Sequence, residues 1–303
     1  MLVILILLAG LVLLFYPQIS NYFAQRNAST AVQEYKALVG QWDDALLEEE
    51  LDKAHAYNAE LRPSTINDPF GADRGPELNA RYRNLLALNE TMAILSIPKI
   101  AVTLPVVHGT HPRDLERRVG HLEGSSLPVG GPGTHAVLTG HTGLSSVKLL
   151  SDMSVLALGD LFFIQVLNMD LAYEIDQIIV VEPHETQALA PVPGKDYLTL
   201  ITCTPYGINS HRLLVRGTRV PFSQELVEAE TAAAKTRGLS EEEQRLIFAA
   251  TVTGAVMLVL IFIVLLIVRR KRKKEEEEAA RAKKEKERLR SWEEVGTDEK
   301  GEE

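Results

Sequence analysis

The sequence is poor in cysteine and in positive charge. One cysteine, Cys203, occurs in 303 residues, so the chain cannot base its fold on internal disulfide bonds. The formal net charge of -9 argues against a nucleic-acid-binding protein, because such a protein needs a basic surface. Acidic residues are plentiful, but their spacing resembles no calcium-binding loop, so the sequence predicts neither a metal site nor a cofactor. The lone thiol is inert packing, an intermolecular link or a reactive group.

Charged side chains are also absent from two apolar stretches. Residues 246–268 contain none, and this length of helix covers about 34 Å, enough to cross a bilayer core of about 30 Å. We predict a transmembrane helix there. Residues 1–16 are apolar as well, but no Lys or Arg precedes Arg26 and no small-residue cleavage site is visible. We therefore favour a retained anchor helix over residues 1–23, with a cleaved signal peptide as the alternative.

A run of six cationic residues, 269–274, directly follows the second apolar stretch. Clustered Lys and Arg mark the cytoplasmic flank of a membrane helix. The Lys/Glu/Arg-rich tail over 269–303 is therefore predicted to be cytoplasmic, as a solvated helix or as disordered chain. The segment between the two spans is then predicted to be extracellular.

The segment between the spans changes character at about residue 92. Residues 24–91 carry apolar side chains at helical spacing up to about Leu61, and a turn-rich stretch follows over 62–77. Residues 92–222 show short apolar runs separated by Gly and Pro, which predict an all-β barrel or sandwich. A polar helix or linker over 223–245 leads to the membrane helix. The predicted strands are 93–97, 100–107, 135–140, 161–166, 171–181, 197–203 and 213–220, with a short helix near 145–153.

Cys203 ends one predicted strand, and a turn-rich loop separates it from a second strand that starts at Arg212. If Cys203 pairs with Arg212, the thiol and the guanidinium lie side by side, whereas a slip of one residue places His211 there. A nearby cation lowers the pKa of a thiol and can also stabilise negative charge on a carbonyl oxygen. From position alone, inert packing of Cys203 and a surface charge at Arg212 both remain open.

Acyl transfer also needs an acid–base group, and eight histidines are available. His141 lies at the end of the predicted strand 135–140, where a rigid scaffold would hold it, and His135 and His211 are its rivals. The others are assigned elsewhere: His55 to a solvated helix face, His108 and His111 to an isolated H-x-x-H that lacks a second ligand pair for zinc, and His121 and His184 to loops.

Several of these segments resemble the sortase family. Thr199–Cys203 resembles the family's TLxTC signature, Arg212 stands at the spacing of its essential arginine, and Leu138–His141 resembles its histidine segment. Longer stretches resemble the pilus-assembling class C sortases: Leu95–Ile100, Leu104–Thr110, Gly120–Gly131 and Cys203–Asn209. The resemblance covers about Leu95 to Val220. It implies a sortase-type β-barrel with short helices, preceded by an N-terminal helical segment and flanked by transmembrane helices.

Two features outside this region also resemble class C. Asp68, Pro69 and Phe70 resemble the class C lid motif, in which the Asp lies towards the arginine and the ring towards the cysteine. Taken alone, Asp-Pro in a loop is an ordinary turn. A C-terminal transmembrane helix with a charged tail is also similar to class C.

The resemblance implies an extracellular cysteine transpeptidase. Cys203 would attack the Thr–Gly bond of an LPxTG-type sorting signal on a pilin, His141 would act as acid and base, and Arg212 would stabilise the oxyanion or the substrate carbonyl. A lysine of the next pilin would then resolve the thioacyl enzyme. Anchoring of proteins to peptidoglycan is the alternative within this chemistry. A membrane-anchored adhesin or scaffold with an inert cysteine is the non-enzymatic alternative.

Overall fold

The structure is a computed structural model that describes residues 2–61, 67–71, 78–142, 148–236 and 241–298. The chain divides into two compact units, Gly10–Gly238 and a second unit made of Met1–Ala9 with Leu239–Glu303.

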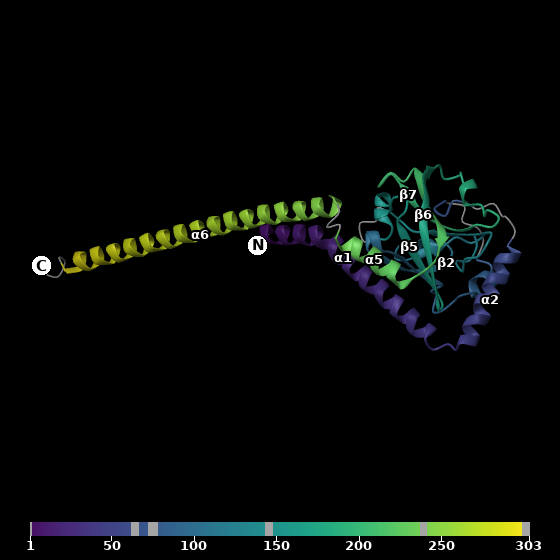
Figure 1. Ribbon diagram of the computed structural model, residues 1–303. Coiled ribbons are helices and arrows are strands. Elements are labelled where there is room, and N and C mark those ends of the chain that lie inside the picture. Colours follow the sequence, from purple (N-terminus) through teal and green to yellow (C-terminus); the bar gives the residue numbers. More distant parts are fainter. Residues whose placement is uncertain (1, 62–66, 72–77, 143–147, 237–240, 299–303) are drawn as a thin grey trace. The chain divides into compact units, whose positions relative to one another are not determined.

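A closed eight-stranded β-barrel forms the centre of the unit Gly10–Gly238 (Figure 1). The pairs β2–β3 and β4–β7 are parallel and the other neighbours are antiparallel. In the order in which they neighbour one another, the strands are β1 (Ala93–Ile97), β2 (Val102–His108), β3 (Val119–His121), β4 (Thr134–Thr139), β7 (Asp196–Thr204), β8 (His211–Val220), β6 (Met169–Val181) and β5 (Leu161–Val166). The all-β prediction is confirmed, and the barrel replaces the sandwich alternative.

Seven of the eight strands coincide with predicted runs, and β1 and β5 do so residue for residue. The run predicted from Ile100 starts later, because Pro98–Ile100 forms the 3-10 helix η1. The strand β3 was missed because its three residues are too few to show an alternating pattern. The helix predicted near 145–153 lies partly outside the described residues, and its described end is the 3-10 helix η2 (Ser151–Val155).

Helices precede the first barrel strand and follow the last one along the chain. The predicted helical segment is confirmed as two helices, because the chain leaves the helical path after Val39 and Asp43 caps the second helix by accepting a 2.8 Å hydrogen bond from the Leu46 amide. The linker is helical too, and its apolar residues pack against β5. The helices are α1 (Leu2–Val39), α2 (Asp44–Glu60), α3 (Ala80–Asn84), α4 (Pro112–Leu115) and α5 (Gln224–Thr236), with the 3-10 helix η3 (Gln187–Leu189) before β7.

Tyr35 joins helix α1 to the barrel. Its side chain is buried, and its hydroxyl donates to the Met92 carbonyl at 3.1 Å and accepts from the Leu167 amide at 2.7 Å. Burial raises the pKa of Tyr35 to about 12, so the hydroxyl keeps its proton at any physiological pH. The helix is therefore held on the barrel by a specific polar contact as well as by apolar packing.

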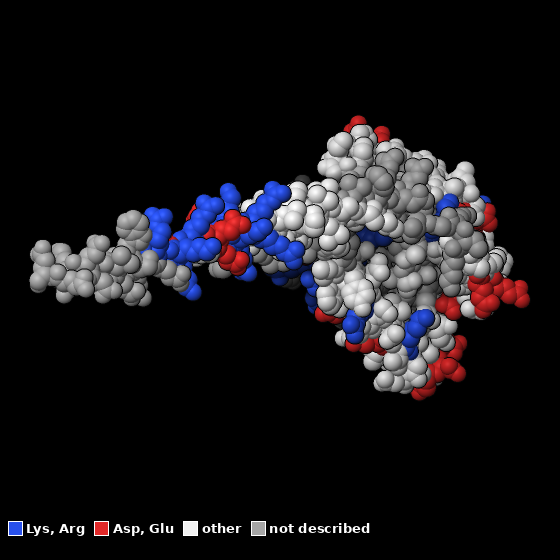
Figure 2. Space-filling view, turned by 90° about the vertical axis from the view of Figure 1, so that its left-hand side faces the viewer, with Lys and Arg blue, Asp and Glu red and all other residues white. Residues whose placement is uncertain are grey.

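The second unit contains helix α6 (Glu241–Asp298). Its segment Thr253–Lys286 is long and apolar enough to cross a membrane, with a mean hydropathy of 2.3 over its most apolar window. It overlaps the predicted span 246–268. Figure 2 shows the Lys and Arg side chains that follow the apolar residues on this helix. The anchor over residues 1–23, the other domain boundaries and the orientation across the membrane stay predictions.

Gly120 in β3 occupies a position that leaves no room for a side chain. A Cβ there would overlap the Gly109 carbonyl oxygen and come within 2.8 Å of the Leu115 side chain. We expect Gly120→Ala to lower the free energy of unfolding by about 1–3 kcal/mol, measured by urea unfolding in detergent, because the backbone must shift. Gly40→Ala is the control, since its Cβ would lie 3.4 Å from the Lys36 carbonyl oxygen, and its effect should stay within about 0.5 kcal/mol. Equal stability of the two variants would contradict the prediction.

Candidate active site

Cys203 and Arg212 face each other on the antiparallel strands β7 and β8. The alternative register is excluded, because His211 pairs with Thr204. Both paired residues are 8% exposed, so the thiol and the guanidinium lie in a site largely closed to solvent. The strand pairing left open by the sequence is thus the one that brings a cation beside the sulfur.

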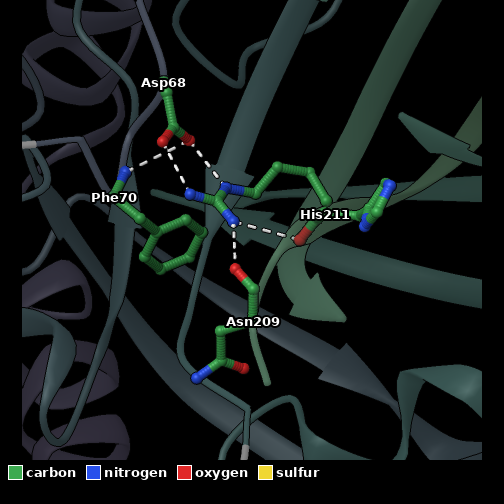
Figure 3. Close-up of polar contacts among 5 residues, drawn as sticks. Asp68, Phe70, Asn209 and His211 are labelled. Carbon is green, nitrogen blue, oxygen red and sulfur yellow. Dashed lines mark hydrogen bonds and ion pairs between the residues drawn. The ribbon is translucent and has the colours of Figure 1, made fainter. Parts of the chain in front are cut away.

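Every nitrogen of the Arg212 guanidinium has a hydrogen-bond acceptor (Figure 3). Nε donates to Asp68 Oδ1 at 2.8 Å and Nη2 donates to Oδ2 at 2.7 Å, which is a two-point ion pair between the predicted lid and β8. Nη1 donates to the carbonyl oxygens of Asn209 and His211, each at 3.0 Å. Asp68 raises the pKa of Arg212, so the cation is permanent.

Phe70 of the predicted lid packs against two of the candidate residues. Its ring centroid lies 5.2 Å from Arg212 Cζ and 5.3 Å from the centroid of the His141 ring, so one aromatic ring contacts both candidate residues. Phe70 and Asp68 are also linked locally, by a long hydrogen bond of 3.4 Å from the Phe70 amide to Asp68 Oδ1. Pro69, between them, is buried.

Phe70 packs on an apolar surface on the outer side of the barrel. Reasoning from the sequence did not identify this surface, although alternation along β4, β7 and β8 carries its signal. We call it the outer apolar surface, and it consists of Leu122, Val137, Leu189, Ile201 and Leu214.

His141 lies level with Cys203 because β4 and β7 run parallel. Thr139 pairs with Ile201, so His141 and Cys203 each follow that pair by two residues at the same end of the barrel. The rival His135 pairs with Tyr197, about 20 Å away along the strand from the level of Cys203. The predicted trio therefore shares one site: Cys203 and Arg212 through the strand pair, and His141 and Arg212 through the Phe70 ring.

The two rival histidines have structural partners. His135 is buried, and its ring nitrogens lie 2.7 Å from Thr199 Oγ1 and 3.1 Å from the Ala190 carbonyl oxygen. Burial lowers its pKa, which keeps the ring neutral. His211 forms a 2.8 Å contact with the hydroxyl of Ser210, at the surface.

The position predicted for His121 is wrong. It belongs to β3 rather than to a loop, and it is fully buried with partners on both ring nitrogens: Nδ1 lies 2.8 Å from the Tyr82 hydroxyl and Nε2 lies 2.8 Å from the Ser126 carbonyl oxygen. Burial lowers its pKa to about 4. This histidine therefore joins α3 to the barrel.

The two histidines of the H-x-x-H sequence have separate partners within the chain. His108 Nε2 lies 2.7 Å from the Leu85 carbonyl oxygen, and His111 caps α4 by accepting from the Arg113 amide. Within the part of the chain that the structure describes, no three His, Cys, Asp or Glu side chains are arranged to hold a metal ion. His55 is exposed on α2, as predicted.

The closed arrangement favours the protonated form of the Cys203 thiol. Burial raises its pKa, the charge of Arg212 lowers it and the Asp68 carboxylate raises it again, with a net upward shift. The two-point ion pair directs the Arg212 guanidinium towards Asp68, and the Phe70 ring packs beside that guanidinium. The described geometry thus places the three candidate groups at one end of the barrel and favours the form of the thiol that is not nucleophilic.

The model of the sortase-domain family matches residues 95–220 of this chain. Among solved structures, sortase C-1 from Actinomyces oris is 49% identical with a TM-score of 0.56, and the match covers 58% of this chain and 99% of that one. Sortase C of Streptococcus pneumoniae is 44% identical with a TM-score of 0.59, covering 64% of this chain and 97% of that one.

Curated relatives match over a shorter part of their length. Sortase D of Bacillus subtilis (strain 168) is 31% identical over 134 residues, which are 43% of this chain and 65% of that protein, so the chain spans about two thirds of its length. Together with the barrel, these matches show that the chain belongs to the sortase family. Its similarity to the sortases C of Actinomyces oris, Streptococcus pneumoniae and Streptococcus agalactiae confirms the class C resemblance.

Proposed function

We propose that this protein is a cysteine transpeptidase that cleaves an LPxTG-type sorting signal and joins the released carboxyl end to a lysine of a pilin. The observation that carries the proposal is the pairing of Cys203 with Arg212 at the level of His141. A thiol, a cation and an imidazole in one sheltered site are the groups that acyl transfer through a covalent intermediate requires.

The first half-reaction forms the thioacyl enzyme. The Cys203 thiol gives its proton to the His141 imidazole, and the resulting thiolate attacks the carbonyl carbon of the Thr–Gly bond. Arg212 stabilises the negative charge on the carbonyl oxygen or holds the substrate carbonyl. The C–N bond then breaks, and the His141 imidazolium donates a proton to the departing glycine amine.

The second half-reaction transfers the acyl group. A lysine amine attacks the thioester carbon, the neutral His141 imidazole takes a proton from that amine, and the C–S bond breaks to restore the Cys203 thiolate. The product is an isopeptide bond between two pilins. Neither step needs a metal or an oxidant.

The pilin substrate is supported by relatives. A pilus-related sortase C of Group B Streptococcus is 39% identical and matches 97% of its own length, with a TM-score of 0.60. The lid motif points to the same subclass. The candidate span in α6 supports attachment to a membrane, and we place the barrel outside the cell because the cationic run follows that span.

The lid has a regulatory role in this proposal. Asp68 occupies both donors on one edge of Arg212, and Phe70 packs on the outer apolar surface next to Arg212 and His141. Substrate binding requires both side chains to leave, so the free enzyme is closed.

A choice of amine acceptors tests the assignment to pilus assembly. We expect the full chain in detergent, supplied with an LPxTG peptide, to join it to a lysine-bearing pilin at least about tenfold faster than to a peptidoglycan-type amine, measured by mass spectrometry at equal amine concentration. The pilin with its acceptor lysine replaced by arginine is the matched control. Faster transfer to the peptidoglycan-type amine would instead favour a sortase that anchors proteins to the cell wall.

A further inference from the structure

Thr139 carries a polar atom that the folded chain does not use. The residue is 0% exposed, and its Oγ1 has no hydrogen-bond partner within the part of the chain that the structure describes. Buried hydroxyl groups nearly always have a partner, because an unpaired one loses its bonds to water without replacement. A hydroxyl left in this state needs an explanation.

Strand alternation places this hydroxyl on the outer side of the barrel. Ala136 and Leu138 belong to the barrel core, and a Cβ on Gly140 would meet the side chain of Leu150, which is also in the core. Val137 and Thr139 therefore point the other way. Val137 is part of the outer apolar surface on which Phe70 packs.

The hydroxyl is close to the reacting groups. Thr139 pairs with Ile201, and both Cys203 and His141 lie two residues further on, about 7 Å along the parallel strands. It belongs neither to the proposed catalytic trio nor to the lid.

The buried hydroxyl groups of two neighbouring threonines on β7 do have hydrogen-bond partners. Thr202 Oγ1 donates to the Gly140 carbonyl oxygen at 2.9 Å, and Thr199 Oγ1 lies 2.7 Å from His135 Nε2. Thr139 lies between these bonds and takes part in neither. Of these three hydroxyl groups, only that of Thr139, beside Ile201 of the outer apolar surface, is left without a partner.

We propose that Thr139 is a substrate-binding residue whose Oγ1 accepts a hydrogen bond from a main-chain N–H of the bound sorting-signal peptide. The proposal rests on the function proposed above. When Phe70 leaves the outer apolar surface, an extended peptide takes its place. Its N–H groups follow one another about every 3.3 Å and point alternately to opposite sides, so an N–H on the side of β4 comes within reach of the hydroxyl. The leucine and proline side chains cannot serve, because they have no donor.

Paired substitutions separate a substrate contact from a structural role. Thr139→Val keeps the shape and removes the hydroxyl, and we expect kcat/KM for thioacyl formation to fall about five- to tenfold, measured as hydroxylamine-dependent peptide cleavage. The melting temperature should not fall, because the change removes an unpaired buried polar atom. Thr139→Ser should stay within about twofold of the parent rate.

Thr134→Val is the matched control on the same strand. Thr134 Oγ1 donates to the Gly131 carbonyl oxygen at 2.7 Å, so its loss should lower the melting temperature and leave the cleavage rate unchanged. Peptides with each amide N–H near the cleavage site replaced by an ester oxygen identify the donor. At one position the ester should slow the parent enzyme and leave Thr139→Val without a further loss.

Two results would overturn the proposal. One is a cleavage rate for Thr139→Val within twofold of the parent. The other is a fall in melting temperature that matches the fall in rate, with no restoration by serine. If the parent chain itself forms no thioacyl adduct, the proposed function fails instead, so the two failures are distinguishable.

Discussion

Replacing Cys203 with alanine is expected to abolish both the covalent adduct with an LPxTG peptide and the transfer of that peptide to a lysine. The chain has no other thiol, so no second sulfur can take over the attack. Removal of a nucleophile that forms the covalent intermediate should lower the rate by at least about 10⁴-fold, to background. Intact-mass measurement of the full chain after incubation with peptide detects the adduct directly.

Cys203→Ser is the matched variant, since it keeps the size of the side chain and replaces the thiol with a hydroxyl. It should fold like the parent and form no thioester, which separates loss of chemistry from loss of structure. Pilin polymerisation that persists in Cys203→Ala would reject the transpeptidase. It would favour the alternative of a membrane-anchored adhesin or scaffold, in which Cys203 is inert packing.

The barrel was predictable because most of its strands carry local patterns. Apolar runs and turn residues are features of neighbouring positions in the sequence, and they identify β1, β5 and β6 within two residues at each end. The strand β3 has only three residues, one of them Gly120, and owes its place to pairing with β2 and β4. A strand defined by its partners leaves no such pattern.

The candidate site depended on pairings that the sequence does not contain. His135 and His141 stand an even number of positions apart along the predicted strand and its end. Strand alternation therefore predicts the same face for both side chains and cannot choose between them. Only the parallel pairing of β4 with β7 places His141, and not His135, level with Cys203. The contact between Asp68 and Arg212 spans 144 residues, and only resemblance to a known lid motif suggested it. The unpaired hydroxyl of Thr139 depends on the whole surrounding structure, so no sequence pattern could indicate it.

Opening the lid should make Cys203 more reactive. We expect Asp68→Asn to speed labelling of Cys203 by iodoacetamide about tenfold at pH 7. The substitution removes a carboxylate that raises the thiol pKa, and it frees Arg212, whose charge lowers that pKa. Phe70→Ala should speed labelling as well, because it removes the ring that covers the site and reduces the burial that raises the same pKa.

The control is a second aspartate–arginine ion pair that lies away from Cys203. Asp176 accepts two hydrogen bonds from Arg216, at 2.9 and 3.1 Å, also on β8. Asp176→Asn therefore breaks a two-point ion pair of the same kind away from the thiol, and it should leave the labelling rate unchanged.

The pH dependence of the labelling rate separates a change in the thiol pKa from a change in the access of the reagent to Cys203. Labelling follows the thiolate, so a variant with a lower thiol pKa gains most below its own pKa, and the gain falls as pH rises through the parent's pKa. Above both values each thiol is fully ionised, and any remaining difference reports access alone. Asp68→Asn should thus lose most of its advantage at high pH, whereas Phe70→Ala should keep a larger part. If neither variant speeds labelling or peptide hydrolysis, the lid does not gate the site, and the ion pair between Asp68 and Arg212 is only a structural contact of the closed chain.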